Sequence, residues 1–238
     1  MVGLQNLPFN AVFPFRLHDP VQHPKAYVVI FVWQVVFLWY NMISIVGFEL
    51  ASVHCFPQVA LNLKILCIEL RHIGRIVSFD QNNFRNELIR RILFHQRIIS
   101  IVRDINSVFY APFLAQMICL FLMISLSTFE ALAARRDPIA AFRFVFFMVL
   151  SFCHLSYWSV FGDMVNQQSK EVAIAAYDIY NWHELSPKLQ RDIMFIIQRA
   201  QKPLCIVASP FPPFNLTSYM MVLKQCYSIL TLLLEALD

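Results

Sequence analysis

The chain has 238 residues, of which 58% are hydrophobic and 14% are charged, with a mean hydropathy of +0.57 and a formal net charge of +4. A soluble domain carries about 25% charged residues, so this composition argues against a soluble globular protein. The basic residues do not gather on one polar face, which excludes a nucleic-acid binder. The composition predicts a membrane protein with lipid as its surroundings.

Long apolar stretches recur along the chain and predict membrane-spanning helices. Roughly 20 apolar residues in a helix cross a hydrocarbon core about 30 Å thick. Each stretch reaches that length, and only the last contains a charged residue, Lys224. The stretches are residues 26–48, 105–129, 144–162 and 215–234. We therefore predict an all-α fold, a polytopic membrane helical bundle.

The segments between these stretches predict long helices that extend into a cytoplasmic layer. Ser186-Pro187 is a helix-start signal, and an apolar stripe at helical spacing follows it at Leu189, Ile193, Ile196 and Ala200. In chain order we expect an extracellular loop (1–25), a transmembrane helix (26–54), a cytoplasmic helical extension (55–104), a transmembrane helix (105–130), an extracellular loop (131–141), a transmembrane helix (142–163), cytoplasmic helices (164–212) and a last transmembrane helix (213–236).

The distribution of Lys and Arg predicts the orientation. They are concentrated in residues 55–104 and 164–212, which the positive-inside rule places in the cytoplasm. Both ends of the chain then lie outside, and we expect a multi-pass plasma-membrane protein with an extracellular C-terminus. Residues 1–25 contain no apolar signal segment that would carry them across. We therefore expect that Met1 is not the natural start and that an odd number of spans precedes it.

The last predicted span carries a polar stripe. Lys224, Ser228, Thr231 and Glu235 share one helix face, at spacings of i, i+4, i+7 and i+11. Lipid cannot satisfy such groups, so the stripe must face water or a neighbouring helix. A water-lined conduit and a packed polar seam both remain open interpretations.

The outer halves of the other spans offer a candidate ligand surface. Aromatic side chains with a few polar anchors suit a small apolar ligand. Ordinary helix packing is the alternative for each residue. The candidate ligand-binding residues are Trp33, Gln34, Phe37, Phe121, Ser125 and Phe146.

Motifs for catalysis, cofactors and metals are missing from the sequence. The four glycines cannot form a GxGxxG or P-loop motif, and the histidines show no HExxH spacing. The cysteines form no CxxC pair. We expect no enzyme activity, no cofactor and no metal site.

Several motifs resemble those of the insect odorant receptors, over nearly the whole length of the chain. The last block of motifs is the most specific. The similar segments are Leu7-Pro8-Phe9, Phe13-Pro14-Phe15 and Tyr27; Phe161-Gly162-Asp163, Ser169, Tyr177 and Trp182; and Gln201-Lys202-Pro203, Pro213-Phe214-Asn215-Leu216, Leu223-Lys224 and Tyr227-Ser228. The resemblance implies helices four to seven of a seven-helix receptor with an inverted topology.

The same resemblance implies a function. Members of this family bind small apolar odorants and form tetrameric cation channels with a shared co-receptor, and each subunit contributes its last helix to the pore. By this resemblance Leu232 and Ala236 match a hydrophobic constriction, and Glu235 lies beside it. Lys224, Ser228 and Thr231 complete the candidate pore residues. The expected function is that of an odorant-gated channel subunit in the sense of smell.

Two alternatives remain at this stage. A secondary transporter fragment would show repeated helices interrupted by Gly or Pro, and only the approach to the last helix is interrupted here. A truncated, non-functional receptor remnant is the stronger alternative, because three upstream spans would be missing.

Overall fold

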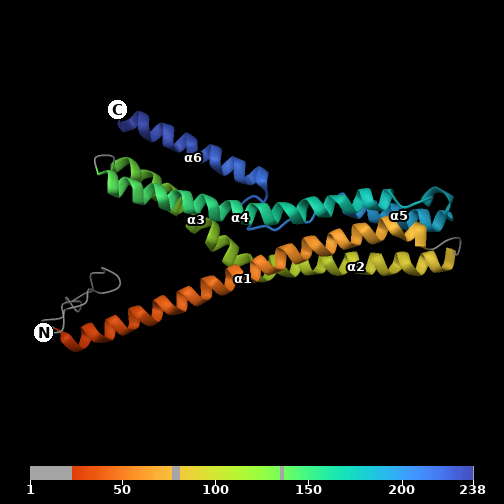
Figure 1. Ribbon diagram of the computed structural model, residues 1–238, viewed down its shortest axis with the longest axis horizontal. Helices are drawn as coiled ribbons and strands as arrows, with labels where there is room; N and C mark the ends of the chain where they lie inside the picture. The colour runs from red at the N-terminus through yellow and green to blue at the C-terminus, as the bar shows by residue number, and fades with distance from the viewer. Residues whose placement is uncertain (1–22, 77–80, 135–136, 238) are drawn as a thin grey trace. The chain divides into compact units, whose positions relative to one another are not determined.

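The computed structural model describes residues 23–76, 81–134 and 137–237, and every regular element in them is helical (Figure 1). The elements are α1 (Pro24–Ile76), α2 (Gln81–Val108), α3 (Tyr110–Ala133), α4 (Pro138–Tyr177), the short 3₁₀ helix η2 (Trp182–Glu184), α5 (Pro187–Ala200) and α6 (Leu216–Leu237). The predicted all-α class is confirmed. The helices α1, α3 and α4 are long and apolar enough to cross a membrane. Within the described residues α6 is not among these helices, and its sequence contains Lys224.

The chain divides into two compact units, residues 1–54 and 55–238. Within the first unit, the described residues form the first part of α1, and most of its apolar side chains are exposed, including Trp39 and Tyr40. A helix that is apolar around its whole circumference is typical of a membrane environment. Gln34 is an exception to the exposure, since it is buried.

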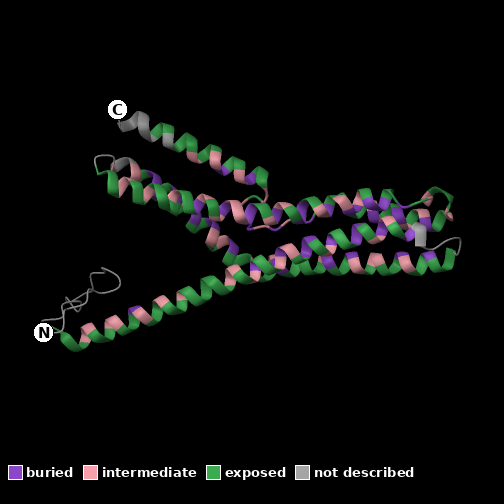
Figure 2. Ribbon diagram, in the orientation of Figure 1, coloured by how far each residue is buried: buried purple, intermediate pink, exposed green. Residues whose placement is uncertain are grey.

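In the second unit, the later parts of α1 and α4 run beside α2 and α5 and form one layer (Figure 1). The buried residues concentrate in this layer (Figure 2). All members of the predicted α5 stripe are buried there. The apolar core of the layer includes Leu63, Leu66, Leu70, Leu88, Ile98, Val165, Val172, Leu189 and Ile193.

Ion pairs at the edge of this layer join α1 to its neighbours. Arg71 lies 3.1 Å from Glu171 and 3.4 Å from Asp178, both on or next to α4. Arg91 on α2 pairs with Glu69 of α1 at 3.4 Å. These side chains are partly exposed, so each pair adds less than about 1 kcal/mol and mainly fixes the helix register.

The second predicted span does not continue as one straight helix into the layer. Instead α2 ends at Val108 and α3 begins at Tyr110. Pro112 explains the break, because proline has no N–H to donate to the carbonyl four residues earlier, that of Val108. The helix therefore changes direction at Phe109.

By contrast, α4 is a single helix of 40 residues that joins the predicted span to the layer that contains α2 and α5. Its first turn is capped by the Asp137 side chain, which accepts hydrogen bonds from the backbone N–H groups of Ile139 and Ala140. Pro138 occupies the first helical position, where its missing N–H costs nothing.

The segment between α5 and α6 is held by polar side chains from α2 and α4. Asn106 donates to the carbonyl of Cys205 at 2.9 Å and accepts from the backbone N–H of Val207 at 3.1 Å. Ser169 accepts from the N–H of Leu204 at 2.9 Å. These bonds satisfy backbone N–H and C=O groups in a segment that does not itself form a helix.

The start of α6 is fixed by close packing on α4. The Asn215 side chain caps the helix by accepting from the N–H of Ser218 at 2.7 Å. Gly162 of α4 packs against the backbone of Phe214. A Cβ atom on Gly162 would lie 2.2 Å from the Phe214 carbonyl oxygen. Only a glycine allows this approach of the two backbones.

Candidate ligand cavity and pore helix

A cavity of about 390 Å³ lies between α3 and α4. This volume lies near the lower end of the range for small-molecule sites, about 300–1,000 Å³. Most of its lining is apolar, with a small number of polar groups at one end. The lining residues are Gln116, Cys119, Leu120, Met123, Phe147, Leu150, Ser151 and His154.

The polar end of the cavity is a hydrogen-bonded chain of three side chains. The amide nitrogen of Gln116 lies 3.3 Å from Nδ1 of His154 and 3.4 Å from Nε2. Trp158 donates its indole N–H to Nε2 of His154 at 3.0 Å. A buried indole normally needs such a partner. The chain therefore connects the cavity to the buried Trp158.

Trp158 belongs to an aromatic cluster that reaches the start of α6. Its ring centroid lies 5.6 Å from that of Phe56, 5.3 Å from that of Phe113 and 5.7 Å from that of Phe214. Trp158, Phe56 and Phe113 are each no more than 2% exposed. The cluster therefore connects Trp158 by direct ring packing to Phe214, two residues before α6.

None of the predicted ligand residues lines this cavity. In the first unit, Trp33 stacks on Phe37, both are exposed, and Gln34 is buried. On α3 and α4, Phe121 stacks on Phe211 at 5.6 Å, while Ser125 and Phe146 are exposed. These six residues remain a predicted surface on the spans. The predicted ligand residues included neither His154 nor Gln116, although a glutamine inside an apolar stretch is itself a signal.

The described residues of the predicted polar stripe lie on the exposed side of α6. Val222 and Ser218 are buried, and at about 100° per residue they share one face. Lys224, Ser228 and Thr231 lie about 180–240° around the helix from Val222 and are exposed. Leu232 is also exposed. The side chains of Glu235 and Ala236 lie outside the described residues.

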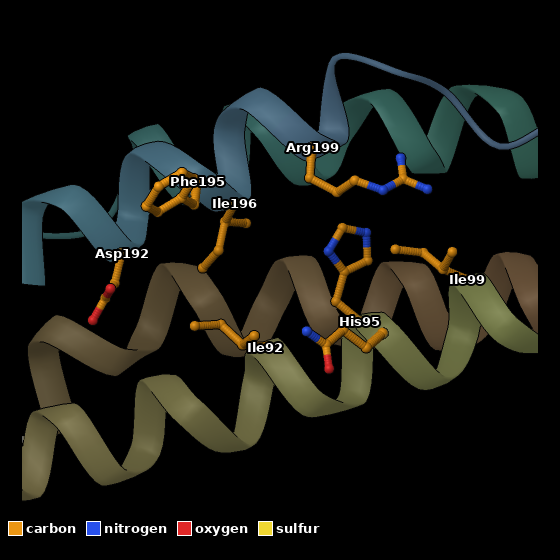
Figure 3. A pocket seen from close by; sticks show the side chains of 8 residues that line it. Ile92, His95, Ile99, Asp192, Phe195, Ile196 and Arg199 are labelled. Carbon is orange, nitrogen blue, oxygen red and sulfur yellow. The ribbon is translucent and has the colours of Figure 1, made fainter.

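A second cavity, of about 400 Å³, lies between α2 and α5 (Figure 3). The His95 ring points from α2 toward Arg199 on α5, and Asp192 lies at the other end of the cavity. Burial, together with the Arg199 guanidinium, lowers the pKa of His95 to about 4. His95 is therefore neutral in the folded layer at neutral pH.

The lowered pKa of His95 predicts that the layer loses stability in acid. Above pH 6.5 His95 is neutral in both the folded and unfolded states. Below pH 6.5 His95 is protonated in the unfolded state but stays neutral in the folded state. The free energy of unfolding therefore falls until the pH reaches about 4. Between pH 7.5 and pH 5 the loss from this residue is about 2 kcal/mol.

Thermal unfolding of the detergent-purified protein at these two pH values checks this prediction. The variant H95Q should lose much less stability than the parent between pH 7.5 and pH 5. The variant H183Q is the control, because His183 is an exposed side chain on η2 and should leave the pH dependence unchanged. Equal pH dependence in the parent and H95Q would contradict the prediction.

Long apolar helices, a cavity between two of them and a final helix with an exposed polar stripe are typical of a polytopic membrane protein. The family model described as "7tm Odorant receptor" matches residues 2–227. The chain therefore belongs to the odorant receptor family, as the sequence motifs indicated.

Relatives and a solved structure agree with this assignment. The chain is 45% identical to Odorant receptor 65a and 45% identical to Odorant receptor 47b of Drosophila melanogaster, over 98% and 100% of its own length. It spans 56% and 58% of those two relatives. Its fold matches that of the olfactory receptor OR5 from Machilis hrabei, solved in complex with eugenol, with a TM-score of 0.68 at 18% identity. The match covers 94% of this chain and 56% of that one.

Proposed function

We propose that this chain is part of an odorant-gated cation channel subunit that assembles with a co-receptor as a hetero-tetramer in the plasma membrane. A small apolar odorant binds among the helices, and binding favours the open channel by its higher affinity for that state. The C-terminus of the chain is extracellular, in accordance with the distribution of Lys and Arg. The Drosophila relatives are named odorant receptors, which supports the ligand class.

The observation that carries the proposal is the position of the polar stripe on α6. Val222 packs against the rest of the chain, so the opposite side, with Ser228 and Thr231, is available to other subunits or to water. Polar groups on a membrane helix need such surroundings. Within the described residues Lys224 forms no ion pair, and its charge would oppose cation flow if it faced the pore.

The aromatic cluster supports a connection between ligand binding and α6. A ligand in the α3–α4 cavity contacts His154, which holds Trp158 by a hydrogen bond, and Trp158 packs on Phe214. Coupling between sites needs such a contiguous set of packed groups with two arrangements. The cluster provides the packed groups through which ligand binding would move the start of α6.

Electrical recording tests the proposal. The complete receptor that carries this sequence is expressed with an odorant co-receptor in cells, and a panel of small apolar volatiles is applied. We expect an inward cation current that requires both proteins and at least one volatile. Normal delivery of both proteins to the cell surface without any evoked current would contradict the proposed function.

A further inference from the structure

The hydrogen-bonding groups at the polar end of the α3–α4 cavity restrict the ligands that the cavity accepts. A neutral imidazole has one N–H donor and one acceptor nitrogen. Trp158 donates to Nε2 of His154, so Nε2 is the acceptor and the proton is on Nδ1. The His154 tautomer is therefore fixed by the indole N–H.

The tautomer in turn fixes the orientation of the Gln116 amide. The amide nitrogen of Gln116 is placed 3.3 Å from Nδ1. Because an N–H donor cannot pair with Nδ1–H, the amide takes its flipped orientation, in which the oxygen accepts from Nδ1–H. The amino group then lies on the other side of the amide. Within the described residues no other hydrogen-bond partner of Gln116 is found, and Gln116 lines the cavity. The polar end of the cavity therefore offers N–H donors.

We propose that Gln116 determines ligand choice in this cavity by donating an amide N–H to the carbonyl oxygen of a small apolar ligand. Apolar side chains such as Leu120, Met123 and Phe147 surround the rest of the ligand. Ketones, aldehydes and esters fit this arrangement, whereas hydrocarbons of the same shape leave the donor without a partner. This inference rests on the proposed function, because it names the ligand class of the same receptor.

A binding measurement that does not depend on current tests the inference. Cys119 lines the cavity and is exposed, so a bound ligand should protect it from a thiol reagent. Cys153 is exposed but is not a lining residue, and Cys67 is buried. In the purified complete receptor, labelling at each cysteine is followed by peptide mass spectrometry in the presence of 2-octanone or 2-methyl-1-octene. These two probes differ only by C=O against C=CH₂.

We expect 2-octanone to protect Cys119 at a roughly fivefold lower concentration than the alkene, which corresponds to one added hydrogen bond. Neither probe should protect Cys153. In the variant Q116M and in the double variant Q116M/H154L, the two probes should protect Cys119 at the same concentration. The control Q167M should keep the preference for the ketone, because Gln167 pairs with Asp163 outside the cavity. Unreactive Cys67 reports that each variant is folded.

Three results would overturn the inference: equal protection of Cys119 by both probes in the parent, no protection at all, or a ketone preference that survives Q116M. If a variant does not fold, the comparison of the two probes in the parent still decides whether the inference holds. Protection without an evoked current would refute the channel function and leave the inference intact. An evoked current without protection of Cys119 would refute the inference and leave the channel function intact.

Discussion

Substitution of Gly162 by alanine should abolish the ligand-evoked current and destabilise the protein. The new Cβ atom would lie 2.2 Å from the Phe214 carbonyl oxygen and 2.8 Å from the Phe214 Cβ atom, so the two backbones must separate. Overpacking of this kind costs about 1–3 kcal/mol. Because Phe214 precedes α6 by two residues, the separation also displaces the start of that helix. Thermal unfolding and current recording measure the two effects.

Gly47 supplies the matched control for G162A. It also lies in a long helix, but a Cβ atom there meets nothing within 4 Å. Alanine is a better helix former than glycine by about 1 kcal/mol, so G47A should be neutral or stabilising. If G162A unfolded at the same temperature as G47A and gave the same current, the close packing of α4 on Phe214 would not be important.

Substitution of Phe113 by alanine should cause the largest loss of stability in the membrane part of the bundle. Phe113 is fully buried and contacts the rings of Phe56, Trp158 and Phe214. Removing a buried phenylalanine side chain costs about 3–5 kcal/mol, because a cavity remains. The midpoint of thermal unfolding of the detergent-purified protein should fall accordingly.

Phe129 provides the comparison within the same helix. Its side chain is 53% exposed on α3, so F129A removes the same atoms without opening a cavity in the core. We expect F129A to change stability by no more than about 0.5 kcal/mol, as for a typical surface substitution. Similar losses in F113A and F129A would argue against the aromatic cluster as the centre of the bundle.

Helices and their apolar faces could be predicted because they depend on neighbours within the same segment. The α5 stripe from Leu189 to Ala200 follows from helical spacing, and the start at Pro187 follows from the preceding serine. The structure refines this start, because the Ser186 side chain makes no capping hydrogen bond. Pro112 carries a local signal for the break between α2 and α3, but this break was not among the predictions.

The cavity and its polar end could not be predicted in the same way. Gln116 and His154 are 38 residues apart, and their contact depends on how α3 and α4 are rotated against each other. Likewise, Asn106 holds a segment that follows it by about 100 residues. No spacing rule relates such positions. An aromatic residue near the outer end of a span gives a strong local signal for a ligand surface, which explains why Trp33 and Phe146 were selected.

The most direct measurement of the central claim is the accessibility of α6 during ligand-evoked current. The receptor with S228C is expressed with the co-receptor, and a positively charged, membrane-impermeant thiol reagent is applied together with an activating volatile. Val222 is buried on the opposite face of α6, so V222C is the matched control, and the parent accounts for native cysteines such as Cys226. A ligand-gated pore along the polar side of α6 predicts a lasting block in S228C and none in V222C or the parent. An unchanged current in S228C would contradict the claim that this side of α6 lines the path of the ions.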